Sequence, residues 1–151
     1  MYLILAILAF NIMVIVHELG HFIAAKMMGI GVLEFSLFVG PKLFSVTRGG
    51  TRYSVRLFPI MAYVRLEGDE EASDSPTSFN KKPKYARAFT MVAGPLANLL
   101  LAAVLLTGYF AIQGYQTTEI SQIAEGSPAA AAGLRKGDRI ISYGGKRIYA
   151  P

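Results

Sequence analysis

The chain has 151 residues, of which 53% are hydrophobic and only 17% charged, with a formal net charge of +5. This composition favours a membrane protein over an ordinary soluble domain. The absence of cysteine excludes disulfides, cysteine nucleophiles and thiolate metal sites, so any metal must be bound by His, Asp or Glu. Ten of the fifteen Lys and Arg residues lie between Lys26 and Arg87, the segment that joins two apolar runs. Basic residues beside membrane spans follow the positive-inside bias, which argues against nucleic-acid binding.

Residues 1–28 predict a first transmembrane helix. The run from Met1 to Val16 has no charged residue, and the apolar residues after His21 bring it to the roughly 20 residues that span a bilayer. A secretory signal peptide is the alternative. It is disfavoured because no basic segment precedes the apolar run and no small-residue cleavage site follows it.

Residues 29–67 predict a membrane-associated β-hairpin region. The β-prone runs Lys42–Val46 and Thr51–Leu57 flank the pair Gly49-Gly50, which favours a tight turn. We expect Pro59 to end this pairing, because proline lacks the N–H that a strand ladder needs.

Residues 68–87 form a polar loop that the basic residues place in the cytoplasm together with the hairpin, so that residues 29–87 are cytoplasmic. Residues 88–112 predict a second transmembrane helix. The pair Gly94-Pro95 within it predicts a kink or a fresh start. The same helix carries one amide side chain, Asn98.

Residues 117–151 are soluble in character. Strands are predicted at 119–124 and 139–143. Between them, Ser127 predicts a helix N-cap, Pro128 the first helical position and Gly133 the end of the helix. A segment this short is too small to fold stably alone, so we expect the sequence to be a fragment of a longer protein.

The candidate chemistry lies in the first helix, where His17, Glu18 and His21 form an H-E-x-x-H motif. Positions i and i+4 share a helix face, so both imidazoles can reach one ion. Zn²⁺ accepts two histidines plus one further protein ligand and keeps a position open for water. Glu18 can take a proton from that water and deliver it to the leaving amine, which is peptide-bond hydrolysis.

A purely structural interpretation of the motif places the same three side chains at the membrane surface, hydrogen-bonded to headgroups or helices. Ionisable groups at membrane depth are costly and seldom lack a role, so the metal interpretation is favoured.

The motif and its surroundings resemble the site-2 protease family of intramembrane zinc metalloproteases, and most closely the bacterial regulator-of-sigma-E-protease-like branch, which cleaves anti-sigma factors. The resemblance runs over nearly all of the chain. It is carried by Val16 to Lys26, Gly29-Ile30, Glu34-Phe35-Ser36, Gly40-Pro41-Lys42-Leu43, Phe79 to Pro83, Arg87 and Ala93 to Asn98.

The resemblance implies that the hairpin helps to present the substrate strand. Pro59 to Val64 resembles the family's Pro-Leu-Gly-Gly-Tyr-Val element, but Met61 and Ala62 replace both glycines, and Phe38-Val39 departs from the usual Gly-Phe. The family also implies that Asn98 lies near the active site and contacts the substrate. Considered without the resemblance, an Asn in a membrane helix is as readily explained as a residue that hydrogen-bonds to a neighbouring helix.

The tail of the chain, with Ser127-Pro128-Ala129 and Gly137-Asp138, resembles the opening of a PDZ domain that the chain truncates. A plain turn is the alternative for Gly137-Asp138, and the combined spacing favours the PDZ interpretation. In the family this domain lies on the far side of the membrane, so we expect it to be extracytoplasmic and able to bind peptides. The family's third zinc ligand is an aspartate in a later Leu-Asp-Gly motif. No such motif occurs here, so the third ligand is expected outside this chain.

The sequence therefore predicts an α-helical membrane protein with a membrane-associated β-hairpin and a truncated PDZ-like α/β segment. The expected function is zinc-dependent regulated intramembrane proteolysis of membrane-anchored signalling proteins, in a bacterial inner membrane. Its expected partners are a transmembrane substrate and the lipid bilayer. Two alternatives are an inactive membrane-tethered PDZ adaptor and a metal transporter. The second is disfavoured because transporters place polar residues on several helices.

Overall fold

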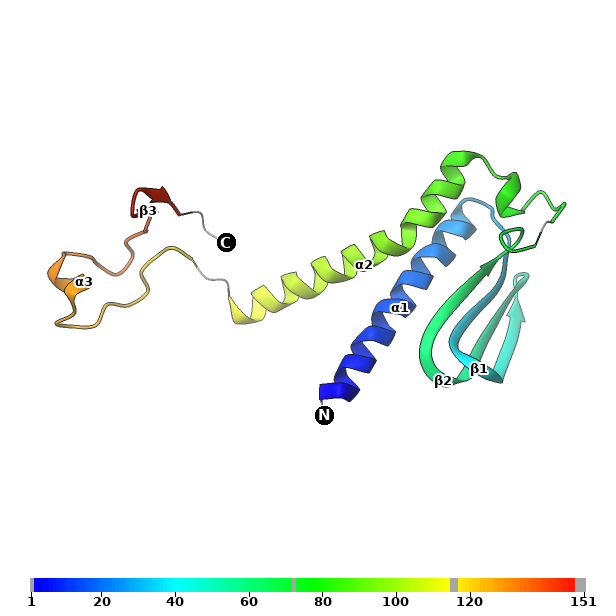
Figure 1. Cartoon of the computed structure of the whole chain (residues 1–151), viewed down its shortest axis with the longest axis horizontal. Helices are drawn as coiled ribbons and strands as arrows, with labels where there is room; N and C mark the ends of the chain where they lie inside the picture. Colours follow the sequence, from blue (N-terminus) through cyan, green and yellow to red (C-terminus); the bar gives the residue numbers. More distant parts are fainter. Residues whose placement is uncertain (1, 72, 115–116, 149–151) are drawn as a thin grey trace. The chain divides into compact units, whose positions relative to one another are not determined.

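The computed structural model describes residues 2–71, 73–114 and 117–148. The elements in chain order are α1 (Tyr2–Met27), β1 (Val32–Arg48), β2 (Thr51–Leu66), the 3₁₀ helix η1 (Phe79–Lys81), α2 (Lys84–Gln113), α3 (Pro128–Ala131), β3 (Ser142–Tyr143) and β4 (Lys146–Arg147) (Figure 1). The chain divides into two compact units, Met1–Leu106 and Thr107–Pro151, each with its own internal contacts.

Helices α1 and α2 are long and apolar enough to cross a bilayer. Their most apolar stretches are almost unburied by the rest of the described chain, with 0% of that stretch buried in α1 and 11% in α2. The core helix of a soluble domain would instead bury its apolar side chains. Helix α2 begins at Lys84, before the expected residue 88, and it runs through Pro95 as one helix rather than starting afresh there.

The hairpin turn has the predicted position. Arg48 pairs with Thr51, and both Gly49 (φ 57°) and Gly50 (φ 76°) have the positive φ of a two-residue primed turn. Beyond this turn the sheet differs from the expectation, because β2 does not end at Pro59. Pro59 has no pairing partner, but it ends only the first pairing, since the strand continues and pairs again.

The second pairing folds the sheet back on itself. Phe35 in the first half of β1 pairs with Tyr53 on one side and with Val64 on the other. The first half of β1 is therefore central, and the end of β2, residues 62–66, lies at an edge. Figure 1 shows both strands curling beside α1, on the side away from α2.

A small core fixes the hairpin to the end of α1. Its buried members come from α1, β1, β2, η1 and the connection after α1: Ala25, Ile30, Val32, Leu66 and Phe79. Burial of these apolar groups holds the edge of the sheet beside the helix that carries H-E-x-x-H.

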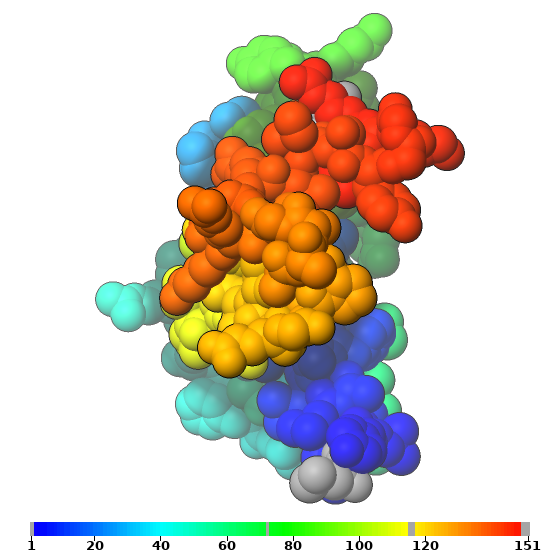
Figure 2. Space-filling view, turned by 90° about the vertical axis from the view of Figure 1, so that its left-hand side faces the viewer, coloured from blue at the N-terminus to red at the C-terminus, as the bar shows by residue number. Residues whose placement is uncertain are grey.

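The second unit forms little regular structure among its described residues. The predicted short helix is present: Ser127 Oγ accepts a hydrogen bond from the Ala130 N–H at 3.3 Å, and Gly133 has φ 84°. The predicted strands are largely absent. Glu119 makes only an isolated bridge with Arg139, and β3 is two residues long. None of the described residues from 107 onward is buried, so no core holds longer strands in place there. The surface of this second unit is yellow to red in Figure 2.

Candidate metal centre

The candidate centre forms where α1 and α2 pack closely. A Cβ added to Gly20 would lie 2.5 Å from the carbonyl oxygen of Ala93 and 2.9 Å from Cβ of Ala97. Only a glycine permits this approach, and small residues are the usual means by which membrane helices come together. The contact places the H-E-x-x-H segment against the α2 stretch that includes Gly94 and Asn98.

The two histidines converge on one point. The Nε2 atoms of His17 and His21 lie 3.1 Å apart. Two nitrogen ligands of a tetrahedral Zn²⁺ at 2.0–2.1 Å would lie about 3.3 Å from each other. The donor set and its spacing therefore fit two ligands of one metal ion.

The other ring nitrogens are held by α2. Nδ1 of His21 lies 2.7 Å from the carbonyl oxygen of Thr90, and Nδ1 of His17 lies 3.3 Å from Nδ2 of Asn98. Such partners on the distal ring nitrogen fix the tautomer and the ring orientation of a metal-binding histidine. The structure thus brings three of the predicted site residues together, with His17 in contact with both His21 and Asn98.

Glu18 is held at the edge of the sheet. Its Oε2 accepts a hydrogen bond from the backbone N–H of Val64 at 3.0 Å, and Oε1 has no such partner among the described residues. Glu18 and His21 line a common cavity of about 210 Å³. The remaining lining residues are Val64, Leu66, Asp69, Thr90 and Met91.

The metal ligands are incomplete in the described part of the chain. Residues 2–71, 73–114 and 117–148 contain no group of three or more His, Cys, Asp or Glu side chains able to hold a metal ion. Asp69 lines the cavity beside Glu18 but belongs to no such group. The third ligand predicted outside this chain stays a prediction.

Sequence reasoning missed the contributions of Thr90, Val64 and Gly94. Thr90 and Val64 act through backbone atoms, which carry no side-chain signature. Gly94 acts by lacking a side chain, and its sequence signals were its place in the Gly94-Pro95 pair and in the family-like stretch from Ala93 to Asn98.

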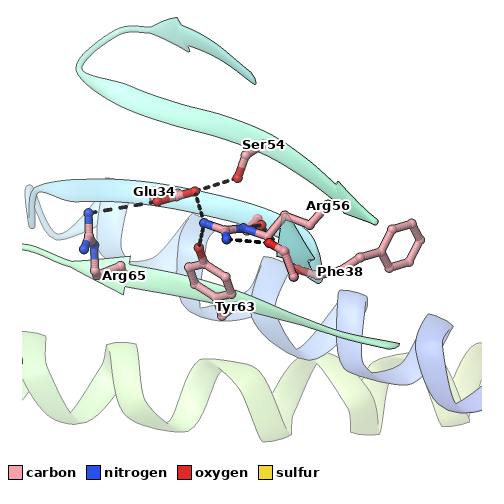
Figure 3. A network of polar contacts seen from close by, with 8 residues as sticks. Glu34, Phe38, Ser54, Arg56, Tyr63 and Arg65 are labelled. Atoms are coloured by element: carbon pink, nitrogen blue, oxygen red, sulfur yellow. Dashed lines mark hydrogen bonds and ion pairs between the residues drawn. The ribbon is translucent and has the colours of Figure 1, made fainter. Parts of the chain in front are cut away.

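A second polar cluster, the hairpin network, joins the first half of β1 to both halves of β2 (Figure 3). Glu34, only 3% exposed, accepts hydrogen bonds from Ser54 Oγ at 2.6 Å and Arg56 Nη2 at 3.2 Å. Arg56 also donates to Tyr63 Oη at 2.6 Å. Nη2 of Arg65 lies 4.0 Å from Oε2 of Glu34. Burial alone would raise the pKa of Glu34. The bonds from Ser54 and Arg56, and the charge of Arg56, outweigh burial and hold that pKa below its ordinary value of 4.5.

Helix-borne histidines one turn apart with an adjacent glutamate define the H-E-x-x-H class of zinc peptidases. The chain belongs to Peptidase family M50, whose sequence profile matches residues 5–139. The resemblance to the site-2 protease family is thereby confirmed at the level of the family, whereas the finer branch and the PDZ-like tail stay predictions.

Three relatives, each named "Putative zinc metalloprotease", illustrate the similarity. The protein of Clostridium perfringens is 39% identical over 149 residues, which is 99% of this chain and 44% of the relative. That of Clostridium acetobutylicum is 39% identical over 147 residues, with 97% and 43% covered. That of Thermotoga maritima is 38% identical over 138 residues, with 88% and 28% covered. The chain thus spans less than half the length of these relatives.

Proposed function

We propose that this chain is part of an intramembrane zinc metalloendopeptidase. His17 and His21 are its metal ligands, and Glu18 is the group that moves protons. The observation that carries the proposal is the 3.1 Å approach of the two Nε2 atoms beside a carboxylate that shares a cavity with His21.

The chemistry divides between the ion and the protein. Zn²⁺, when bound, acidifies water and polarises a carbonyl oxygen. Glu18 is positioned for the proton transfer, because the Val64 N–H fixes its Oε2 and leaves Oε1 to accept a proton. The proton held at Oε1 then goes to the amine that leaves when the peptide bond breaks.

The hairpin supports substrate binding in an extended form. A helical substrate hides its carbonyls in hydrogen bonds and must unwind before hydrolysis. Residues 62–66 lie at a sheet edge, and the Val64 N–H points at Glu18 rather than at another strand. A substrate strand added along this edge would lie beside Glu18.

The wider assignment follows the family resemblance. The substrates are membrane-anchored signalling proteins such as anti-sigma factors, and the membrane is the bacterial inner membrane. Residues 29–87 face the cytoplasm. Residues 117–151 open a PDZ domain on the other side, where peptide binding restricts access. The two long apolar helices support the membrane setting.

The test replaces Glu18→Gln in the full-length protein, purified in detergent without chelators. We expect cleavage of a transmembrane reporter substrate to fall by about 10²–10⁴-fold, the usual contribution of general acid–base catalysis. Stoichiometric zinc should remain, measured by elemental analysis. Glu70→Gln, at an exposed position, is the matched control and should cleave normally. Unchanged cleavage by Glu18→Gln would refute the role of Glu18, and a zinc-free wild-type protein would favour the PDZ adaptor.

A further inference from the structure

Three residues of α2, spaced four apart, face the two histidines: Thr90, Gly94 and Asn98. We propose that this stripe shapes the metal site. Asn98 is a positioning residue that holds His17 as an Nε2 ligand, and Gly94 keeps the position of the ion free. The inference rests on the proposed function, because it requires a metal at the two imidazoles.

The carbonyl of Thr90 settles the state of His21. A carbonyl oxygen only accepts hydrogen bonds, so Nδ1 of His21, 2.7 Å away, must carry the proton. In the neutral ring, Nε2 then presents a lone pair toward His17. His21 is therefore held in the tautomer that binds metal through Nε2.

The amide of Asn98 can hold His17 in the same tautomer. Its Oδ1 is buried and has no hydrogen-bond partner among the described residues, while Nδ2 lies 3.3 Å from Nδ1 of His17. Turning the amide by 180° exchanges two groups of nearly equal size. In the turned orientation Oδ1 accepts a hydrogen bond from the Nδ1–H of His17, and Nδ2 takes the buried position.

This orientation has a consequence for the metal. With both Nδ1 atoms protonated in neutral rings, two lone pairs face each other across the 3.1 Å between the Nε2 atoms. Two lone pairs repel unless a cation lies between them. The amide orientation in which Oδ1 accepts from His17 is thus the orientation that leaves both Nε2 lone pairs for a bound cation.

Gly94 provides the space. A Cβ added there would lie 2.7 Å from Nε2 of His17 and closer still to Nε2 of His21. It would occupy the region toward which both nitrogens point. Gly20 has a different role, because its added Cβ would meet the Ala93 backbone and force the helices apart.

The Asn98 part is tested by zinc competition titrations on the full-length protein in detergent, using a chromophoric chelator. Asn98→Leu keeps the size but removes the acceptor, and we expect zinc affinity to fall 10–100-fold, the usual cost of losing such a partner. Asn98→Asp keeps an acceptor and should restore affinity to at least the wild-type level. In the Co²⁺-substituted protein, the visible ligand-field spectrum should shift in Asn98→Leu but not in Asn98→Asp. Asn11→Leu, a buried amide on α1 bonded to Ile7, is the matched control and should leave affinity unchanged.

The Gly94 part uses Gly94→Ala, which should abolish stoichiometric zinc. The control Gly108→Ala adds its methyl group to open space on the same helix and should bind normally. Should Gly94→Ala fail to fold, the Asn98 series, which leaves the helix spacing intact, decides the proposal.

The outcomes separate the two proposals. A wild-type protein without zinc would overturn the proposed function. A zinc-loaded wild type whose affinity and Co²⁺ spectrum are the same in Asn98→Leu would overturn only the role of Asn98 as a positioning residue. Loss of cleavage in both Asn98 variants with zinc affinity intact would assign Asn98 to the substrate instead. A folded Gly94→Ala variant with wild-type zinc affinity would overturn the role of Gly94.

Discussion

The metal centre and the hairpin network are both polar clusters in a largely apolar chain, but they are satisfied in opposite ways. In the network, the buried carboxylate of Glu34 accepts hydrogen bonds from Ser54 and Arg56 and forms an ion pair with Arg56. Its charge is therefore balanced within the protein. At the metal centre, the Nε2 atoms of His17 and His21 point at each other. The Nδ1 atom of each histidine faces a group on α2, and the two Nε2 atoms face only each other among the described contacts.

This difference distinguishes polar residues that stabilise the fold, in the hairpin network, from polar residues proposed to bind a ligand, at the metal centre. A closed network stabilises one conformation, because removing any member leaves a buried group without its partner. Two nitrogen donors that converge on one point can instead be bridged by a further group, here the proposed metal ion. Changes in the hairpin network should therefore lower stability and spare zinc binding, whereas changes at the metal centre should do the reverse.

The largest expected effect on stability is that of Arg56→Met. Arg56 is the nearer of the two arginines beside the buried carboxylate of Glu34. Its removal leaves Glu34 with only Ser54 and the more distant Arg65 and should cost about 3 kcal/mol. Unfolding in a denaturant titration of detergent-solubilised protein measures this loss. Arg52→Met, at an exposed position of the same strand, is the control and should cost less than about 0.5 kcal/mol. Zinc content should stay at the wild-type level in both variants, and loss of zinc in Arg56→Met would break the distinction.

A smaller effect should follow from pH. The folded state lowers the pKa of Glu34 below 4.5, so the stability that this carboxylate contributes is complete above that value. It should be lost as pH falls through the lower pKa of the folded state. The free energy of unfolding should therefore decline below about pH 4.5, with a weaker decline in Glu34→Gln. Glu67 is partly exposed, and the hydrogen bond from Thr77 also lowers its pKa, so it adds to the decline with the same sign. Equal slopes in the wild type and in Glu34→Gln would contradict the assignment to Glu34.

The smallest effect concerns Met61, which has φ 67°. A left-handed conformation costs an ordinary residue about 1–2 kcal/mol. Glycine avoids that cost but lowers stability by about 0.5–1 kcal/mol, because it loses more conformational freedom on folding. Met61→Gly should thus stabilise the protein by about 0.5–1 kcal/mol in the same titration. Ala62→Gly is the paired control. It should destabilise, because Ala62 is buried and has no positive φ. Destabilisation by both variants would show that Met61 is not strained.

Local patterns in the sequence predicted much of the fold. The apolar runs indicated both long helices, and Gly49-Gly50 indicated the hairpin turn. The family resemblance also identified positions where this chain has another residue in place of the family's glycine. Two of those departures, Phe38 (φ 70°) and Met61 (φ 67°), are the described non-glycine residues with positive φ.

Long-range features could not be predicted from the sequence. The return of β2 beyond Pro59 depends on pairing with the first half of β1, which no local pattern encodes. At the site, the i, i+4 spacing indicated that His17 and His21 share a face. It could not indicate that Thr90, Gly94 and Asn98 lie opposite them, because that depends on how two distant helices pack. The predicted strands near Glu119 and Arg139 failed because the second unit has no core among its described residues.

The central claim is that His17 and His21 together hold one hydrolytic zinc ion. Its most direct test is the zinc content of the full-length protein, purified without chelators, with X-ray absorption to identify the ligands. We expect one zinc per chain with two imidazole nitrogens at about 2.0–2.1 Å, and none after both histidines are changed to alanine. A metal-free wild-type protein, or a double variant that keeps its zinc, would contradict it.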